Sequence, residues 1–488
     1  MKKVIALFLS LTFVFSLMSC ATKSDDKKPT VGDGPDQKYL EDVSFEGEDI
    51  VIRFALSKAT IGDYTDKEWI SCMVDNITGE TVADNIYRRN EIIKNQLGIE
   101  IEVVETAAQD KFSDTVKPVL MSGDDAYDWL WAQQSKDVDL CTQGFLYDLN
   151  KLGDKNYVDI SADWWASGYI KNIQYKNELY WVTGPLALNY AGGTDGMFIN
   201  ARIYDTKLSE KYGSIYDLVR EGKWTIDTLA EMSSTVFDDK DTSGSITAGD
   251  VYGVAFNSSW SIMQLLIGSG LECSSRNADG SLDFKVVSTN SKLIDIIQKT
   301  YNIFYSTPGI STVRWTSSEE FINGNQLAMF GSVGTLEAFR EMEDDFYLIP
   351  LPKYDLDQPE YRSSVGDNVQ IMGLAYTCQN IEAATATLEL MAYYSAQMVT
   401  HSYYDEALKY KYTRDEEAAE MIDLIADCAY TDFVLIWEWK IWGTLWIRYS
   451  AFSPSASSTI KKGESQVKAT LKTILDKLDE LAQTEFGI

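Results

Sequence analysis

The sequence predicts an α/β protein of two or three lobes, the first of which contains a doubly wound sheet. The chain has 488 residues, which is more than one ordinary domain holds. Near its start an apolar segment, Ile50 to Leu56, precedes a helical pattern and an alternating segment, Ile99 to Val104. A further helix-strand pair, Gln109 to Trp131, comes next, so helices and strands alternate as they do in parallel sheets covered by helices.

The first β-α-β unit follows from the pattern of apolar residues. Ile50 to Leu56 is apolar and bounded by charged residues, as expected of a buried strand. Asn85 to Leu97 places its isoleucines and its last leucine on one helical stripe, and Gly98 is a suitable residue to end that helix. Ile99 to Val104 alternates apolar and polar side chains, which is typical of a strand.

The next unit places polar side chains where a ligand is expected. Gln109 to Met121 has helical spacing, and the Gly-Asp-Asp sequence after it stops the helix. Tyr127 to Trp131 is predicted to be a short buried strand, with Ala132-Gln133-Gln134 as a polar loop at its carboxyl end. Ligands of open α/β sheets gather outside the carboxyl ends of strands. A helical pattern resumes from Val138 to Phe145.

Later segments show the same two periodicities. Thr225 is predicted to cap the amino end of a helix. We expect a strand at Val251 to Phe256, a helix at Ala383 to Ala396, and an amphipathic helix at Gln466 to Leu481.

Composition excludes several classes of function. The formal net charge is −31, with 43 basic against 74 acidic residues, whereas a polyanion or an anionic lipid surface requires a basic face. The hydrophobic content of 45% excludes global disorder. His401 is the one histidine of the chain, which argues against metal sites or catalytic triads that depend on histidine.

The amino-terminal residues resemble a bacterial lipoprotein signal. Two lysines precede the apolar run Val4 to Met18, which leads into Leu-Met-Ser before Cys20. We expect residues 1–19 to be a signal peptide and Cys20 to be acylated. A transmembrane anchor is the alternative, but the run is shorter than the ~20 residues that a span needs. Residues 20–46 are polar and rich in mixed charge, so we expect a flexible tether.

The cysteines beyond Cys20 are odd in number and widely scattered. This does not suggest a disulfide framework, and we expect these residues to be small buried hydrophobic side chains. They are Cys72, Cys141, Cys273, Cys378 and Cys428.

Several sequence motifs of the chain resemble those of extracellular solute-binding proteins, the maltose-binding-protein-like receptors that serve ABC importers. The most specific are YLIPLPK (Tyr347 to Lys353) and ALKYKYTRDEE, within the segment that begins at His401. Others are the turn SGD with the strand YDWLW and then QGFLYDLN, NQLGIEIEV, LYWVTGP followed by MFIN, EGKWTIDTLAEM, and Glu319 to Met329, which resembles a hairpin of the family.

The resemblance implies a two-lobe, type II periplasmic-binding-protein-like fold, with a ligand cleft between lobes joined by hinge strands. Leu179 to Pro185 matches the first hinge strand of the family. The first lobe is predicted to contain residues 47–187 and 366–405. The second lobe is predicted to contain residues 188–365 and 406–488.

The family pattern also implies which residues face the ligand: Trp131, Gln133, Gln134, Asn189, Tyr190, Asn257, Trp260, Ser332, Gly334, Asp367 and Asn368, with Trp437 and Trp439 as lids over the cleft. Each tryptophan has the core as its alternative. For Trp131 we favour the site, because it ends a strand beside two amides. For Trp164, Trp165, Trp442 and Trp446 we favour packing.

The segment from Asp239 to Asp250 approximates a loop that wraps Ca²⁺ with oxygen ligands. Its predicted ligands are Asp239, Asp241, Ser243, Ser245 and Asp250, with Gly244 at the sharp turn. Serine in place of an acid, and aspartate where a bidentate glutamate is usual, should weaken the site. A solvated acidic turn is the alternative. Relatives carry a fuller acidic loop here, which favours a structural calcium, and we expect no other cofactor.

The resemblance implies a function in binding rather than catalysis. No nucleophile elbow, phosphate-binding loop or zinc-binding motif is present, and paired acids carry little signal in so acidic a chain. We expect a monomeric receptor, held by lipid on the outer face of the cell membrane, that captures an oligosaccharide for the permease subunits of an ABC importer. A receptor for a peptide or another polar solute is the alternative, and a glycan-degrading enzyme is a more distant one.

Overall fold

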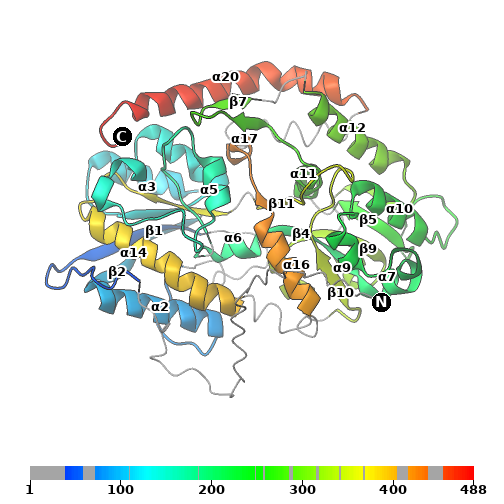
Figure 1. Ribbon diagram of the computed structural model, residues 1–488, viewed down its shortest axis with the longest axis horizontal. Helices are drawn as coiled ribbons and strands as arrows, with labels where there is room; N and C mark the ends of the chain where they lie inside the picture. Colours follow the sequence, from blue (N-terminus) through cyan, green and yellow to red (C-terminus); the bar gives the residue numbers. More distant parts are fainter. Residues whose placement is uncertain are drawn as a thin grey trace, which may run out of the picture. The chain divides into compact units, whose positions relative to one another are not determined.

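The structure is a computed structural model. It describes residues 39–58, 72–108, 110–184, 186–247, 249–256, 259–284, 290–314, 318–339, 342–366, 369–403, 416–437 and 454–488. Two mixed sheets, one of four strands and one of five, organise these residues (Figure 1). In this part of the chain no helix is both long and apolar enough to cross a membrane.

The first sheet has the strand order β12-β3-β1-β2. Strands β1 (Val51–Lys58), β2 (Glu100–Ala108) and β3 (Trp129–Gln133) run parallel, and β12 (Gln370–Leu374) pairs with β3 in the antiparallel direction. The three strands predicted for this region are therefore confirmed. β3 continues two residues beyond its predicted end, so Gln133 is the last residue of the strand rather than part of a loop.

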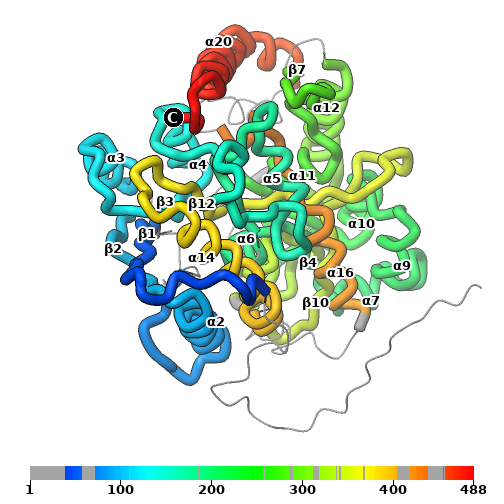
Figure 2. Tube along the Cα trace, turned by 60° about the vertical axis from the view of Figure 1, so that its left-hand side comes forward, coloured from blue at the N-terminus to red at the C-terminus, as the bar shows by residue number. Residues whose placement is uncertain are grey.

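Three helices cover the first sheet: α2 (Thr81–Leu97), α3 (Phe112–Ser122) and α14 (Ile381–Tyr394). α2 ends at Gly98, which has the left-handed φ of 70° that favours glycine, as predicted. α14 lies against α2 and β1 in both views (Figures 1 and 2). Its buried residues and those of the strands form one apolar cluster, which makes this face of the sheet rigid.

The helix predicted at Val138 to Phe145 is replaced by two short turns. α4 (Gln134–Asp137) is followed by the 3₁₀ helix η1 (Val138–Gln143). The Asp137 carboxylate accepts hydrogen bonds from the Gln133 backbone N–H at 3.0 Å and from the Ser113 hydroxyl at 2.6 Å, which fixes the start of the segment. Gly144, with φ 73°, ends it six residues later, and short spans of this kind favour 3₁₀ geometry.

The second sheet has the strand order β10-β4-β9-β5-β8. Its strands are β4 (Asp195–Asn200), β5 (Tyr252–Phe256), β8 (Ile310–Arg314), β9 (Gln326–Ser332) and β10 (Phe346–Ile349). β5 runs parallel to β8 and β9, whereas β4 runs antiparallel to both β9 and β10. The strand predicted at Val251 to Phe256 is confirmed.

Two predictions about strands need correction. Glu319 to Met329 is not a hairpin: the short helix α13 (Glu319–Ile322) turns at Gly324 into β9, whose partners are β4 and β5. A hairpin is excluded because buried Phe321 anchors a helical turn instead of a strand. Within Leu179 to Pro185, which was predicted to be a hinge strand, Val182 makes one isolated bridge to Met372, and Pro185 lies outside the described residues.

The remaining elements are shorter or lie around the second sheet. The predicted cap of α10 is confirmed, since the Thr225 hydroxyl accepts a hydrogen bond from the Thr228 N–H at 3.2 Å. The other helices are α5 (Ser167–Ile173), α6 (Leu188–Gly192), α7 (Ala201–Lys207), α8 (Ser209–Tyr212), α9 (Ile215–Arg220), α10 (Ile226–Val236), α11 (Ser259–Gly268), α12 (Ser291–Ser306), α16 (Glu416–Asp427), α17 (Phe433–Ile436) and α20 (Ala456–Ala482).

The small elements complete the description. Two two-stranded sheets pair β6 (Ser274–Arg276) with β7 (Leu282–Phe284) and β11 (Ser363–Ser364) with β13 (Ala429–Tyr430). η2 (Leu149–Lys151) and η3 (Gly153–Lys155) are single turns of 3₁₀ helix, and η4 (Val333–Phe339) is a longer 3₁₀ helix. η5 (Ser395–Val399) is a π-helical turn that extends α14.

The chain passes between the two sheets beside α6. Thr194, directly before β4, forms a bridge with Val365, and the Gly193 carbonyl accepts a hydrogen bond from the Gly366 N–H at 2.9 Å. These antiparallel contacts join the outgoing and the returning segments of the chain. The chain therefore crosses between the two sheets through closely paired segments, and the two sheets also share one apolar cluster.

Tyr39, the first described residue, packs against aromatic side chains. The ring of Tyr39 lies 5.0 Å from the rings of both Trp164 and Tyr393, and its carbonyl accepts a hydrogen bond from the Gln96 amide at 2.6 Å. Beneath them the buried Glu389 carboxylate accepts hydrogen bonds from the indoles of Trp164 and Trp165, both at 2.8 Å. The two tryptophans thus have the packing role predicted for them.

The cysteines outside the signal behave as small hydrophobic side chains. Cys72, Cys141, Cys273 and Cys378 are buried, Cys428 is partly exposed, and all five are free thiols. The absence of disulfides among them agrees with the expectation from their spacing.

Candidate ligand site

Polar side chains meet at the carboxyl edge of the first sheet. Gln133 ends β3 there, and Gln370, the first residue of the antiparallel β12, pairs directly with it. The Gln133 amide donates a hydrogen bond to the Ser135 hydroxyl at 3.1 Å, and the Gln370 amide donates one to the Ser57 carbonyl at 3.3 Å. Amide groups at the end of a parallel sheet are positioned to meet a ligand.

Trp131 lies one pleat inside that edge and belongs to the core. Its side chain is fully buried, with its ring 6.1 Å from Phe54 in an edge-to-face arrangement. The structure therefore does not agree with the prediction that the Trp131 ring faces the ligand. The reason is that β3 extends to Gln133, which places Trp131 in the middle of a strand rather than at its end.

α6 and α5 surround the same edge with further predicted residues. Buried Asn189 accepts a hydrogen bond from the Gln370 backbone N–H at 3.0 Å. The Gln134 side-chain oxygen accepts a hydrogen bond from the Tyr169 hydroxyl, and the Tyr169 ring lies 5.5 Å from that of Tyr190. The structure therefore brings Gln133, Gln134, Asn189 and Tyr190 into one network.

This edge also collects buried polar atoms that have no hydrogen-bond partner in the structure. They are the Ser57 hydroxyl, the Trp131 indole N–H, and the side-chain oxygens of Gln133 and Gln370. Buried polar groups are nearly always satisfied in proteins, so a local group of exceptions indicates a place where a ligand or ordered water belongs.

The second sheet presents a similar edge. Ser332 ends β9 and pairs with Asp195, the first residue of the antiparallel β4. The buried Asp195 carboxylate accepts hydrogen bonds from the Trp260 indole at 2.7 Å and the Ser364 hydroxyl at 2.6 Å. Trp260 is half-buried on α11. The predicted residues Trp260 and Ser332 thus lie around one buried carboxylate.

α6 brings the two edges next to one another. The Thr194 hydroxyl donates a hydrogen bond to the Tyr190 carbonyl at 2.9 Å, directly before Asp195. Gly334, which was also predicted, is so close to α6 that a Cβ there would lie 3.2 Å from the Gly192 carbonyl oxygen. A larger residue at position 334 would push the second edge away from the first.

Comparisons with known proteins bear on this arrangement. No family model matches the sequence, and no curated protein matches it. Solved structures match the fold. An extracellular solute-binding protein from Staphylococcus aureus, in complex with maltose, has a TM-score of 0.56 at 11% identity, over 87% of this chain and 98% of that one.

Two further structures give the same result. A cyclo/maltodextrin-binding protein complexed with maltotetraose has a TM-score of 0.55 at 13% identity, over 89% of this chain and 99% of that one. UgpB from Mycobacterium tuberculosis, in complex with glycerophosphocholine, has a TM-score of 0.51 at 13% identity, over 82% and 97%. The chain has the two-lobe fold of extracellular solute-binding proteins. The predicted fold class is therefore confirmed.

Not all predicted residues lie at the two edges of this solute-binding-protein fold. Trp437 is buried beside Phe433, with ring centres 6.1 Å apart. It lines a cavity of about 20 Å³, enough for one water molecule, together with residues of η1 and α17 and Leu478 of α20. None of the residues predicted for the ligand site, other than Trp437, lines this cavity. Asn257, Asp367, Asn368 and Trp439 lie outside the described residues, as does Cys20.

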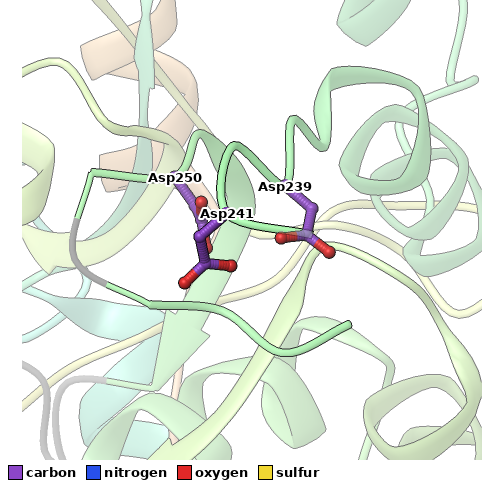
Figure 3. Close-up of side chains that lie close together, drawn as sticks. All are labelled: Asp239, Asp241 and Asp250. Atoms are coloured by element: carbon purple, nitrogen blue, oxygen red, sulfur yellow. The ribbon is translucent and has the colours of Figure 1, made fainter. Parts of the chain in front are cut away.

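The acidic loop of the second sheet converges as the calcium prediction requires. Carboxylate oxygens of Asp239, Asp241 and Asp250 lie within 4.8 Å of one another (Figure 3). Interactions with Ser243, first with its side chain and then with its backbone N–H, lower the pKa of Asp241 to about 2. Three carboxylates at this spacing offer the hard oxygen ligands that Ca²⁺ prefers.

The two serines predicted as calcium ligands contact each other, and one of them also contacts an acid of the loop. The Ser243 hydroxyl donates a hydrogen bond to the Ser245 carbonyl at 2.9 Å, while its backbone N–H bonds to Asp241 at 2.9 Å. Gly244 supplies the left-handed turn, with φ 74°. The loop is therefore already folded around its acids.

Proposed function

We propose that the protein is an extracellular receptor that captures a neutral carbohydrate, an oligosaccharide, and delivers it to an ABC importer. The observation that carries this proposal is the group of unpartnered amide, hydroxyl and indole atoms at the carboxyl edge of the first sheet. The fold supports it, because solved proteins of this fold hold maltose and maltotetraose.

The electrostatic surroundings favour a neutral ligand. Asp137 lies beside Gln133, and Asp195 lies at the second edge, and both carboxylates are buried. An anionic ligand would meet these like charges in a medium of low dielectric constant, where repulsion is strong. Sugar hydroxyls, in contrast, satisfy amide oxygens without a buried charge.

The expected affinity is within reach of such a site. A hydrogen bond made in a site that excludes water contributes about 0.5–1.5 kcal/mol. Micromolar binding corresponds to about 8 kcal/mol, which four to six such bonds and a stacked ring can supply.

The mechanism that this fold supports is closure about the connections near α6. The connections near α6 are the proposed pivot, and rotation about them would have to rearrange the other contacts between the halves, such as those of α20 with α12 and η1. A ligand favours the closed state only through contacts that the open state lacks, which here come from both edges at once. The closed receptor would then dock on the permease subunits and release the ligand.

Residues 1–46 support an extracellular location. We propose that Cys20 is acylated after removal of residues 1–19 and that the protein acts as a monomer on the outer face of the membrane. We also propose that Asp239, Asp241 and Asp250 hold a structural calcium.

The test of the function is ligand-induced stabilisation and tryptophan fluorescence. The soluble chain from residue 39 onward is titrated with neutral oligosaccharides, amino acids, short peptides and glycerophosphocholine. We expect at least one oligosaccharide to change the fluorescence and to add about 2.7 kcal/mol of stability at a concentration of 100 Kd. Stabilisation by a peptide or a phosphodiester alone would contradict the proposal, and release of reducing sugar would indicate an enzyme.

A further inference from the structure

Two glutamines stand side by side at the first edge with their amide groups fixed. Gln133 and Gln370 are 4% and 3% exposed, and they face each other across the β3–β12 ladder. Residues paired in this way hold their Cβ atoms about 5 Å apart and on the same face of the sheet. Their side chains are therefore close enough to contact the same group.

The hydrogen bonds of the two amides set the direction of both carbonyl oxygens. Each NH₂ group donates inside the protein, to the Ser135 hydroxyl and the Ser57 carbonyl. The backbone N–H of each glutamine is also held, by Asp137 and Asn189 respectively. Both side-chain oxygens are left buried without a donor, and the indole N–H of Trp131, on the same face of β3, also lacks a partner.

Two unsatisfied acceptors in a buried position destabilise the fold that contains them. A methionine of similar size would remove that penalty but would also lose the hydrogen bonds to Ser135 and Ser57, so the fold accounts for the two NH₂ groups and not for the two oxygens. Within the described residues nothing donates to either oxygen, which leaves room for the donors of a ligand. An ammonium group would be poorly compensated here, because the two facing side chains are neutral amides and the neighbouring Asp137 carboxylate already accepts hydrogen bonds from Ser113 and Gln133. Adjacent hydroxyls supply two donors without charge.

We propose that Gln133 and Gln370 form a two-oxygen acceptor that binds a vicinal diol of the ligand. This inference rests on the proposed function and adds to it the feature that the site recognises. One hydroxyl donates to each amide oxygen. Because Asp137 lies beside the pair, sugars with a carboxylate next to the diol are disfavoured.

The test compares Gln133→Met and Gln370→Met with a matched control. Gln326 begins β9 and is equally buried, but both halves of its amide are bonded, to Tyr252 and to Ala328. The probes are maltotriose, cellotriose, xylotriose and mannotriose, with trigalacturonate as the anionic counterpart. Calorimetry gives the affinity of each variant, and thermal unfolding without ligand gives its stability.

The expected results separate binding from structure. Each methionine variant at the edge lowers the affinity for the best neutral trisaccharide about threefold to tenfold, while its melting temperature without ligand falls less than that of Gln326→Met, because only the bond from the NH₂ group is lost. Gln326→Met lowers the melting temperature and leaves the affinity unchanged. For the unsubstituted chain, a deoxy analogue that lacks one hydroxyl of the bound diol binds more weakly than the parent sugar. In the variant that lacks the matching amide oxygen, the analogue and the parent sugar bind equally well.

Three results would overturn the inference. An unchanged affinity in both edge variants would remove the glutamines from the site while leaving the proposed function intact. A fall in melting temperature equal to that of Gln326→Met would show that their role is structural. Failure of every neutral trisaccharide to bind the unsubstituted chain would reject the proposed function and the diol site with it.

Discussion

Glu389 is a fully buried carboxyl group that accepts three hydrogen bonds. The indoles of Trp164 and Trp165 and the Asp159 N–H all point to it. Burial raises the pKa of Glu389 to about 7, although the hydrogen bonds from the two indoles oppose the shift. At neutral pH this carboxyl group is therefore close to its midpoint of titration.

The raised pKa makes a prediction about stability and pH. Because the folded pKa lies above the ordinary value of 4.5, the folded state keeps a proton that the unfolded state releases. This contribution to stability is complete below about pH 4.5 and is lost as the pH rises through about 7. Glu389→Gln should remove on the order of 2–3 kcal/mol of that pH dependence.

Chemical denaturation at pH 5 and pH 8 measures the effect. Glu389→Gln is expected to be less stable than the unsubstituted chain at pH 5, because an amide cannot accept all three hydrogen bonds. The two should converge at pH 8. Glu382→Gln, an exposed position on the same helix, serves as the control and should keep the original pH slope. An equal slope in both variants would remove Glu389 from this role.

Residues that begin antiparallel strands explain part of what the sequence did not predict. The rule that ligands gather at carboxyl ends pointed to Gln133 and Ser332, which do lie at the two edges. An antiparallel strand brings its first residue to the same edge, so Gln370 and Asp195 lie beside them. Strand direction is a long-range property, and no local pattern around Gln370 or Asp195 shows it.

The acidic loop between α10 and β5 is a separate folding element with its own prediction. Its acids belong to one short segment, so local spacing was enough to predict their convergence. Weak sites of this kind bind Ca²⁺ with Kd values on the order of 0.1–1 mM. At about 10 mM Ca²⁺ we expect an increase in stability of about 1.4–2.7 kcal/mol over a chelator-treated sample.

The control for calcium uses a second acidic turn of the same chain. Asp279 accepts hydrogen bonds from Ser281 in a comparable turn that is not part of the described three-carboxylate cluster. Asp239→Asn should abolish the stabilisation by calcium, and Asp279→Asn should not. Equal stabilisation of both variants, or an equal response to Mg²⁺, would argue that the loop is only a solvated turn.

At the level of elements, the periodicity of apolar residues predicted whether a segment is a helix or a strand better than it predicted where that segment ends. The long stripes of α2 and α14 were recognised because many residues repeat the pattern, whereas η1 resembled a helix over too few turns to reveal its geometry. The two extra residues of β3 had the largest effect. They moved Trp131 from the predicted site into the core.

On the scale of the whole molecule, α20 connects the two halves of the fold. It packs against α12 of the second half and against η1 of the first. At its carboxyl end the Lys151 ammonium group donates hydrogen bonds to the carbonyls of Ala482 at 2.8 Å and Thr484 at 2.9 Å. The Tyr180 hydroxyl adds a bond to the Gly487 carbonyl at 3.1 Å. The lobe rotation proposed above would therefore require α20 to slide or bend.

Removal of the lysine contacts should release that end of the helix. Lys151→Met is expected to cost about 1–2 kcal/mol and to speed hydrogen exchange in the last turns of α20, because charge-assisted hydrogen bonds to the helix end are lost. Lys472→Met is the control on the same helix. Lys472 is 74% exposed and pairs with Asp476, so its loss should cost less than about 0.5 kcal/mol. Equal exchange in both variants would contradict the role of Lys151.

The contacts of Tyr39 have a consequence for the proposed lipid anchor. If Cys20 carries a lipid, the 19 peptide units between it and Tyr39 could extend at most about 65 Å. Because Tyr39 is held by aromatic side chains, the folded residues would stay within that distance of the membrane. Such a tether would raise the effective concentration of the protein around any partner in the same membrane.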